Sequence, residues 1–307
     1  MHIPDGFLST LVALVFWAIS VIAVAYALRR VGKEIGERQV PLMGVLAAAI
    51  FAGQMLNFNV TGGTSGHLLG AALATILLGP WAAVIILTSV IGIQALIFQD
   101  GGLLAMGANL FNMAIVGVAV SYFVYTSIRK LARGKPWGIL AGGAAAAWLS
   151  IVAAALSAAL QLSLSGISPA NISVPAMGGI HMLIGIGEAG ITVGALVFLY
   201  AARRDLFQAS ESKPKGGALV WVTGLGVALA LAVLSPLAST QPDGLMWVAG
   251  QNGFLNAARA PLYKLIPLYI IPGLSNKSLS TIIAGILGSL LVFGVALAVA
   301  RLGRKKV

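Results

Sequence analysis

Long apolar runs separated by short polar runs recur along the whole chain. A helix needs about 20 apolar residues to cross the hydrocarbon core of a membrane. Nine segments with few or no charges approach or exceed that length, and they lie near 8–28, 41–58, 68–79, 81–98, 102–127, 137–162, 178–201, 216–237 and 279–300. The short segment 68–79, followed by Pro80, predicts a broken or re-entrant helix. The pattern therefore predicts an all-α polytopic membrane protein.

The composition excludes a soluble protein. Of the 307 residues, 59% are hydrophobic and 9% are charged, which leaves too little polar surface for water. The first basic residue, Arg29, follows the first apolar segment, so we expect no signal peptide and a mature N-terminus as written. Cysteine is absent, which excludes disulfides, thiolate metal sites and cysteine nucleophiles. Any metal must be held by nitrogen or oxygen.

The basic residues predict the orientation in the membrane. Four runs hold 16 of the 19 Lys and Arg residues, and all four fall on one side if nine segments cross. They are Arg29, Arg30, Lys33 and Arg38; Arg129, Lys130, Arg133 and Lys135; Arg203, Arg204, Lys213 and Lys215; Arg301, Arg304, Lys305 and Lys306. That side is expected to be cytoplasmic, which places the N-terminus and the segment 238–278 outside. The net charge of +11 is thus a topology signal, and nucleic-acid binding is not expected.

The chain divides at its most polar stretch. Residues 205–217 have linker composition and separate a unit of about seven segments, 1–204, from a second unit, 218–307. The second unit is predicted to be a two-helix hairpin with a long external loop at 238–278. A loop of about 40 residues is usually functional or disordered.

Three histidines, His2, His67 and His181, are predicted near the external face. A free amino group on Met1, the peptide nitrogen of His2 and the near ring nitrogen of His2 can wrap one metal ion through fused chelate rings. Deprotonating a peptide nitrogen requires a metal that favours planar nitrogen ligation, such as Ni(II), Cu(II) or, less readily, Co(II). His67 can supply the fourth nitrogen. Alternatively, His2 is an exposed residue at the membrane interface.

Other polar residues could surround such a site or couple it to a partner. They are Asp5, Asn57, Ser65, Asn109, Asn112, His181 and Glu188. Asp5 could instead cap the first helix, and the asparagines could simply join packed helices. Glu188 is the only acid within an apolar segment, so it marks a polar path, a subunit contact or a packed neutral carboxyl group. The sequence GTSG at 63–66 also fits an intramembrane serine protease with Ser65 as nucleophile and His181 as base.

Four motifs resemble one known family. MHIPDGFLS at the start, GTSGHLLG at 63–70, GANLFNM at 107–113 and HMLIGIGEAGIT at 181–192 are similar to the CbiM/NikM family. Its members are substrate-binding subunits of cobalt and nickel energy-coupling-factor transporters. SPLASTQPDGLMWVAG at 235–250 resembles the PDGLE-type auxiliary subunit of the same transporters, with Met246 where an acid is expected.

The resemblance implies a metal site made of Met1, His2 and His67. It also implies that Ni(II) or Co(II) is the transported substrate, that there is no resident cofactor and that the chain is not an enzyme. The implied partners are a membrane coupling subunit and ATP-hydrolysing subunits, and the implied location is a prokaryotic inner membrane. The chain has no GxxxxGK[ST] phosphate loop, so ATP hydrolysis is expected to belong to those partners. An ATP-independent carrier or channel remains the alternative.

Overall fold

A computed structural model describes residues 1–36, 39–202 and 218–305. Residues 37–38, 203–217 and 306–307, which include the predicted linker and several basic residues of the four runs, lie outside the described residues. The helices are α1 Thr10–Glu34, α2 Val40–Met55, α3 Ala71–Leu78, α4 Pro80–Ile97, α5 Met106–Asn109, α6 Gly117–Leu131, α7 Trp137–Leu164, α8 Ala170–Ala202, α9 Ala218–Val233, α10 Gly244–Gln251 and α11 Lys277–Lys305. A π-helix, Leu110–Val116, joins α5 to α6.

The prediction of an all-α polytopic membrane protein is confirmed. Six helices of the described chain are long and apolar enough to cross a membrane, and α2 and α9 are shorter apolar helices. The predicted break is present, because Gly79 has a φ of +80° and separates α3 from α4, with Pro80 in the first turn of α4. The eight residues of α3 span about 12 Å, which is well short of a bilayer.

One predicted boundary is wrong. The seventh segment was expected at 178–201, whereas α8 begins at Ala170. Pro175 lies in the second turn of α8, where it removes the hydrogen-bond donor that would face the carbonyl of Asn171, yet the helix continues through it.

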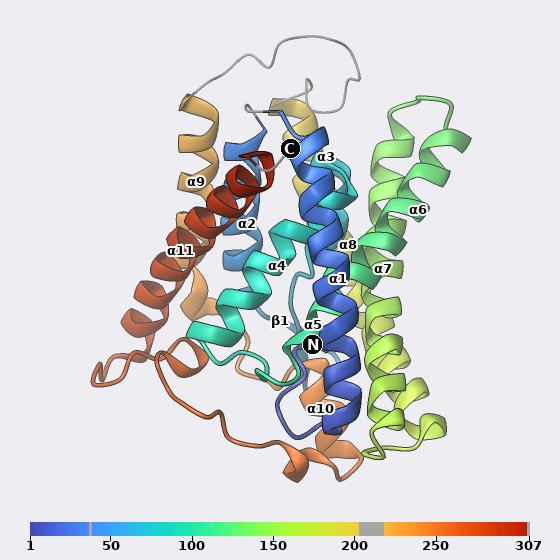
Figure 1. The fold of residues 1–307 in the computed structure, drawn as a ribbon, viewed down its shortest axis with the longest axis vertical. Coiled ribbons are helices and arrows are strands. Elements are labelled where there is room, and N and C mark those ends of the chain that lie inside the picture. Colours follow the sequence, from blue (N-terminus) through green and yellow to red (C-terminus); the bar gives the residue numbers. More distant parts are fainter. Residues whose placement is uncertain (37–38, 203–217, 306–307) are drawn as a thin grey trace.

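The elements form two groups of helices around α1 and α4 (Figure 1). On one side α7 packs between α6 and α8, and on the other α11 packs on α2 and α9. Small residues allow this second contact, because a Cβ atom at Gly288 of α11 would lie 2.1 Å from the Phe51 ring of α2. The only regular strands in the described residues are β1, Phe58–Val60, and β2, Thr64–Gly66, which form an antiparallel hairpin with Phe58 opposite Gly66.

The N-terminal arm, residues 1–9, lies with the β1–β2 hairpin and α10 in one half of the bundle (Figure 1). The C-terminal ends of α1 and α11 lie in the opposite half. Segments that are far apart in the sequence therefore meet there. The arm comes from the first residues, the hairpin from the connection between α2 and α3, and α10 from the connection between α9 and α11.

Candidate metal centre

The N-terminal arm is buried and held by hydrogen bonds on its main chain. Met1 and His2 are 4% and 7% exposed. The N–H of Ile3 donates to Asn109 Oδ1 at 2.8 Å, and Asn109 Nδ2 donates back to the Ile3 carbonyl at 3.1 Å. The N–H of Gly102 donates to the same carbonyl at 2.9 Å. Asn109 thus holds both main-chain polar groups of Ile3, the residue that follows His2.

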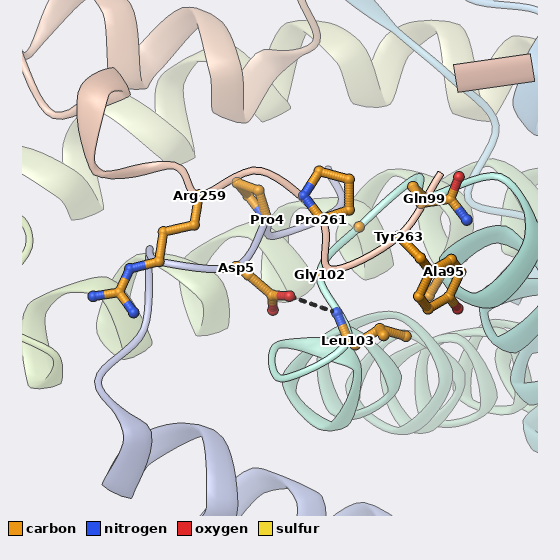
Figure 2. A pocket seen from close by; sticks show the side chains of 10 residues that line it. Pro4, Asp5, Ala95, Gln99, Gly102, Leu103, Arg259, Pro261 and Tyr263 are labelled. Carbon is orange, nitrogen blue, oxygen red and sulfur yellow. Dashed lines mark hydrogen bonds between the residues drawn. The ribbon is translucent and has the colours of Figure 1, made fainter. Parts of the chain in front are cut away.

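Asp5 anchors the arm at a place that the sequence did not indicate. Its carboxylate accepts the N–H groups of Leu103, Leu104 and Ala105 at 3.0, 2.9 and 3.1 Å, just before α5. The expectation that Asp5 caps the first helix is wrong, because Ser9 is the N-cap of α1 and accepts from the N–H of Val12. Figure 2 shows the Asp5 carboxylate turned toward Leu103.

His67 follows the hairpin and turns one ring nitrogen toward the arm. Its Nδ1 donates to the carbonyl of Leu68 at 2.9 Å, which leaves the lone pair of the neutral ring on Nε2. That Nε2 lies 2.6 Å from the amino nitrogen of Met1. Gly62 and Gly63, at φ of +91° and +80°, make the tight turn between the strands, a conformation that glycine adopts without strain.

The two histidine rings lie next to one another. The His2 and His67 rings are stacked, with centroids 5.5 Å apart and an interplanar angle of 17°. His2 Nε2 lies 3.1 Å from Gln94 Oε1, and His2 Nδ1 lies 3.4 Å from the Asp100 carboxylate. The structure thus brings together the residues predicted as ligands, while their role in binding metal stays a prediction.

Both rings are neutral, as metal ligation requires. Burial, followed by the nearby charge of the Met1 ammonium, lowers the pKa of His67 to about 3. Burial also lowers the pKa of His2, against the opposing effect of the Asp100 carboxylate. The imidazole rings of His2 and His67 therefore do not have to lose a proton before they can bind a metal near neutral pH.

Asp243 reaches the same place from the second unit, and the sequence reasoning missed it. Its Oδ2 lies 2.8 Å from the amino nitrogen of Met1, and its Oδ1 accepts the N–H of Met246, which caps α10. The N–H of Ser65 donates to the Pro242 carbonyl at 2.8 Å, so the loop lies beside β2. The motif PDGLM carries this acid three residues before Met246, the position at which the resemblance implies an acid.

The pKa of the Asp243 carboxyl is held well below its usual range. Burial alone would raise it, but the Met1 ammonium and the N–H of Met246 outweigh burial. Asp243 is therefore an anion at neutral pH.

The segment 259–269, which lies between α10 and α11, contacts both the arm and the end of α4. The N–H of Arg259 donates to the Asp5 carbonyl at 2.7 Å, and the Tyr263 hydroxyl donates to the Leu96 carbonyl at 2.7 Å. The Tyr269 hydroxyl donates to Asp100 at 2.7 Å. A small cavity of about 50 Å³ remains between this segment and the arm, lined among others by Pro4, Asp5, Arg259 and Tyr263 (Figure 2).

Glu188 supports the segment that carries His67. Its carboxylate accepts the N–H groups of Leu69 and Gly70 at 2.6 and 3.0 Å, at the start of α3. The carboxylate thereby satisfies the N–H of Gly70, the N-cap of α3, and that of the residue before it. Glu188 is thus tied to the candidate site through two peptide groups, and within the described residues it forms no hydrogen bond with a histidine.

His181 shares no hydrogen bond with Met1, His2 or His67 in the part of the chain that the structure describes. Because α8 begins at Ala170, His181 is eleven residues into the helix, deeper than predicted. Its Nδ1 donates to the Met177 carbonyl at 2.8 Å, and its ring packs against Gly244, where a Cβ atom would lie 2.9 Å from the ring. His181 therefore supports the docking of α10.

Two of the three asparagines are not beside the histidines. Asn112 joins Gln161 and Ser157 of α7 by hydrogen bonds of 2.8 and 2.7 Å, which matches the helix-joining alternative. Asn57 accepts the N–H of Ser239 on its main-chain carbonyl, and within the described residues its side chain bonds to neither histidine.

Ser65 does not form the dyad that a protease would require. Its hydroxyl donates to the Gln241 carbonyl at 2.9 Å, while the Nδ1 of His181 is bonded to Met177. In the described part of the chain Ser65 and His181 share no hydrogen bond. The protease alternative therefore has no geometric support.

The described residues contain no cluster of three His, Cys, Asp or Glu side chains that could hold a metal ion. The candidate site is of another kind, because two of its nitrogens belong to the main chain of Met1 and His2.

Two family profiles together match most of the chain. The family described as "Cobalt uptake substrate-specific transmembrane region" matches residues 2–206, and the PDGLE domain matches residues 218–305. Both resemblances read from the motifs are thereby confirmed.

Relatives and solved structures agree with these matches. A putative fused nickel transport protein of Archaeoglobus fulgidus is 37% identical and aligns over 99% of both chains. A cobalt transport protein of Sorangium cellulosum is 34% identical over 67% of this chain and 94% of its own. The crystal structure of a truncated transition metal transporter, 38% identical, covers 66% of this chain and 99% of its own with a TM-score of 0.58.

Proposed function

Since the chain belongs to the CbiM family of cobalt uptake substrate-specific transmembrane proteins, we propose that it captures Ni(II) or Co(II) in a planar site of four nitrogens. The nitrogens are the Met1 amine, the His2 amide, His2 Nδ1 and His67 Nε2. The amine and the amide close a five-membered ring, and the amide and Nδ1 close a six-membered ring. His67 occupies the fourth position, opposite the amide.

The observation that carries the proposal is the distance of 2.6 Å between the Met1 amine and His67 Nε2. In a planar site these two nitrogens are neighbours at a right angle. With metal–nitrogen bonds of about 2.0 Å, such neighbours lie about 2.8 Å apart. The arm thus needs little movement to admit a metal, which lowers the cost of ordering the site.

Two carboxylates balance the charge of the bound ion. A divalent metal with one deprotonated amide keeps a net positive charge, and buried charge is costly unless it is paired. Asp243 lies 2.8 Å from the amine, and Asp100 lies 3.4 Å from His2 Nδ1. Their side chains are 19% and 28% exposed, more than those of Met1 and His2, so they are also the charged groups that an incoming cation meets first.

Nickel fits this site slightly better than cobalt, because planar ligation by an amide nitrogen favours low-spin nickel. The relatives named above include both a nickel and a cobalt transport protein. We therefore propose both ions as substrates, with the chain acting as a transport subunit and not as an enzyme.

Import would depend on other subunits. The sequence has no phosphate-binding loop, so ATP hydrolysis would belong to cytoplasmic partners that act through a membrane coupling subunit. The N-terminus would face outward and the C-terminus the cytoplasm, as the basic runs predict. Release would require the planar cage to be distorted when these partners move the subunit. Residues 1–204 would form the capture unit and 218–307 the auxiliary unit, joined by 205–217.

Calorimetric titration tests the site directly. Ni(II) and Co(II) are titrated into the chain that starts at Met1 and into a variant with a Gly-Ser segment of several residues added before Met1, because a single added residue would leave a free amine and two amide nitrogens within chelating reach of the His2 ring. The extension converts the Met1 amine into a peptide nitrogen, so we expect it to abolish measurable binding. The same segment added after Val307 is the matched control. Equal affinity of the N-terminally extended protein would rule out the chelate.

Reconstitution separates the proposal from an ATP-independent carrier or channel. The chain alone in liposomes is expected to take up no nickel, and uptake is expected only with the coupling and ATPase subunits and ATP. Uptake by the chain alone would favour the carrier.

A further inference from the structure

Two buried glutamine side chains connect the His67 segment with the His2 ring. Gln54 of α2 and Gln94 of α4 are 5% and 0% exposed. Gln54 Nε2 donates to the Leu69 carbonyl at 3.0 Å, Gln94 Nε2 donates to Gln54 Oε1 at 2.8 Å, and Gln94 Oε1 faces His2 Nε2 at 3.1 Å. We call Leu69, Gln54, Gln94 and His2 the glutamine relay.

The direction of every hydrogen bond in the relay follows from its first member. A main-chain carbonyl can only accept, so Gln54 must present its NH₂ group to Leu69 and its oxygen to Gln94. Gln94 must then donate to Gln54, which turns its own oxygen toward His2. That oxygen also only accepts, so His2 must donate from Nε2.

The consequence is a defined tautomer of His2. A neutral imidazole carries one hydrogen, and if it is on Nε2 the lone pair is on Nδ1. Of the two ring nitrogens, only Nδ1 is close enough along the chain to share a metal ion with the amide nitrogen of its own residue. The relay therefore holds the hydrogen on the nitrogen that the chelate does not use.

We propose that Gln94, oriented by Gln54, is a positioning residue that selects the metal-binding tautomer of His2 and fixes its ring. The proposal rests on the proposed function, because it assigns a role within the same site. It uses only groups of the chain itself, and neither glutamine touches the metal.

The anchor of the relay is itself fixed. The N–H of Leu69 donates to Glu188 at 2.6 Å, so the peptide groups on both sides of Leu69 are held, one by α8 and one by α2. Leu69 lies two residues after His67. The relay thus ties the ring of one ligand to the backbone of the other, and this sets their relative positions before metal arrives.

The test is nickel binding by Gln94→Leu, Gln94→Glu and Gln54→Leu, with Gln161→Leu as the control. Gln161 is also a buried glutamine in a membrane helix, bonded to Asn112 away from the site. We expect Gln94→Leu to bind Ni(II) about 10–100-fold more weakly, the usual effect of removing the group that orients a metal-ligating histidine. Gln94→Glu keeps an acceptor for Nε2–H and should bind more tightly than Gln94→Leu. Gln54→Leu frees the Gln94 amide to turn over and should weaken binding less than Gln94→Leu.

A spectroscopic measurement distinguishes positioning from loss of structure. At saturating Ni(II), the visible absorption band of planar nickel should be weakened or displaced in Gln94→Leu and unchanged in Gln161→Leu. Unchanged affinity and an unchanged band in Gln94→Leu would overturn the proposal. If Gln94→Leu does not fold, Gln54→Leu decides, and native affinity in that variant would equally overturn it. If the unmodified chain binds no nickel, the proposed function fails instead, so the two failures are distinguishable.

Discussion

Two networks of buried amide groups lie within the same apolar bundle, and they end differently. Asn112, Ser157 and Gln161 bond to one another between the π-helix and α7, and their donors and acceptors meet within the group. The glutamine relay instead ends on His2, whose ring stacks on that of His67 and whose Nδ1, which keeps a lone pair in the proposed tautomer, lies 3.4 Å from the Asp100 carboxylate. A network that closes on itself joins helices, whereas one that ends on an open lone pair prepares a binding site.

The largest expected effect follows from removing a ligand of the site that the glutamine relay supports. His67→Ala deletes the fourth nitrogen of the proposed site, so nickel affinity should fall by more than about 100-fold, beyond the usual effect of supporting residues. His181→Ala, which removes the buried histidine beside Gly244, should bind nickel within a few-fold of the unmodified chain. Calorimetry on both variants checks this. Similar losses in both would mean that His181 belongs to the site.

A smaller effect is expected from the two asparagines at the start of the α5–α6 region. Asn109→Ala leaves the buried N–H of Ile3 unpaired, at about 1–3 kcal/mol, while the Ile3 carbonyl keeps the N–H of Gly102 as a partner. The arm should loosen and nickel affinity should fall about 10-fold or more. Asn112→Ala should lower the unfolding temperature in detergent while it leaves nickel affinity unchanged. The comparison fails if both variants lose affinity equally.

The docking of α10 can be tested with two glycines of the same helix. A Cβ atom at Gly244 would lie 2.8 Å from Ile184 and 2.9 Å from the His181 ring, whereas at Gly250 no described atom lies within 4 Å. Gly244→Ala should cost about 1–3 kcal/mol through overpacking and move Asp243 away from Met1. Gly250→Ala should have no such effect. Thermal unfolding and nickel titration of both variants measure the difference.

The smallest expected effect is a dependence of stability on pH through His67, beside the His2 end of the glutamine relay, which the closed network of Asn112, Ser157 and Gln161 cannot produce. The pKa of His67 falls from 6.5 to about 3 on folding, so the unfolded chain binds more protons between these values and stability decreases as the pH falls through that window. From pH 7 to pH 6 this amounts to about 0.7 kcal/mol. Asn112, Ser157 and Gln161 do not titrate there. The unfolding temperature of His67→Asn should therefore fall less over this interval than that of the unmodified chain, and an equal fall would contradict the assignment.

The sequence was sufficient for features that depend on local pattern. Runs of apolar residues located the membrane helices, and Gly79 with Pro80 located the break between α3 and α4. The meeting of His2 and His67 was also predictable, because the basic runs put both on the same side.

Contacts between residues that are far apart in the sequence were not predictable. Asp5 pairs with the segment before α5 and Asp243 with the Met1 amine, and no spacing in the sequence relates these residues. The start of α8 was missed because the apolar run begins only near residue 178, whereas the helix extends back through a more polar turn to Ala170. Gln54 and Gln94 were overlooked because a single amide in an apolar helix has no pattern, and its meaning depends on what faces it.

The grip of Glu188 on Leu69 and Gly70 has a mechanical consequence. Glu188 lies near the middle of the long helix α8, and its carboxylate holds the backbone of Leu69, two residues after His67. A displacement of the far end of α8 is transmitted to the imidazole through the backbone of only two residues, Leu68 and His67. A shift of α8 that seems minor on the scale of the bundle is large on the scale of a metal–nitrogen bond.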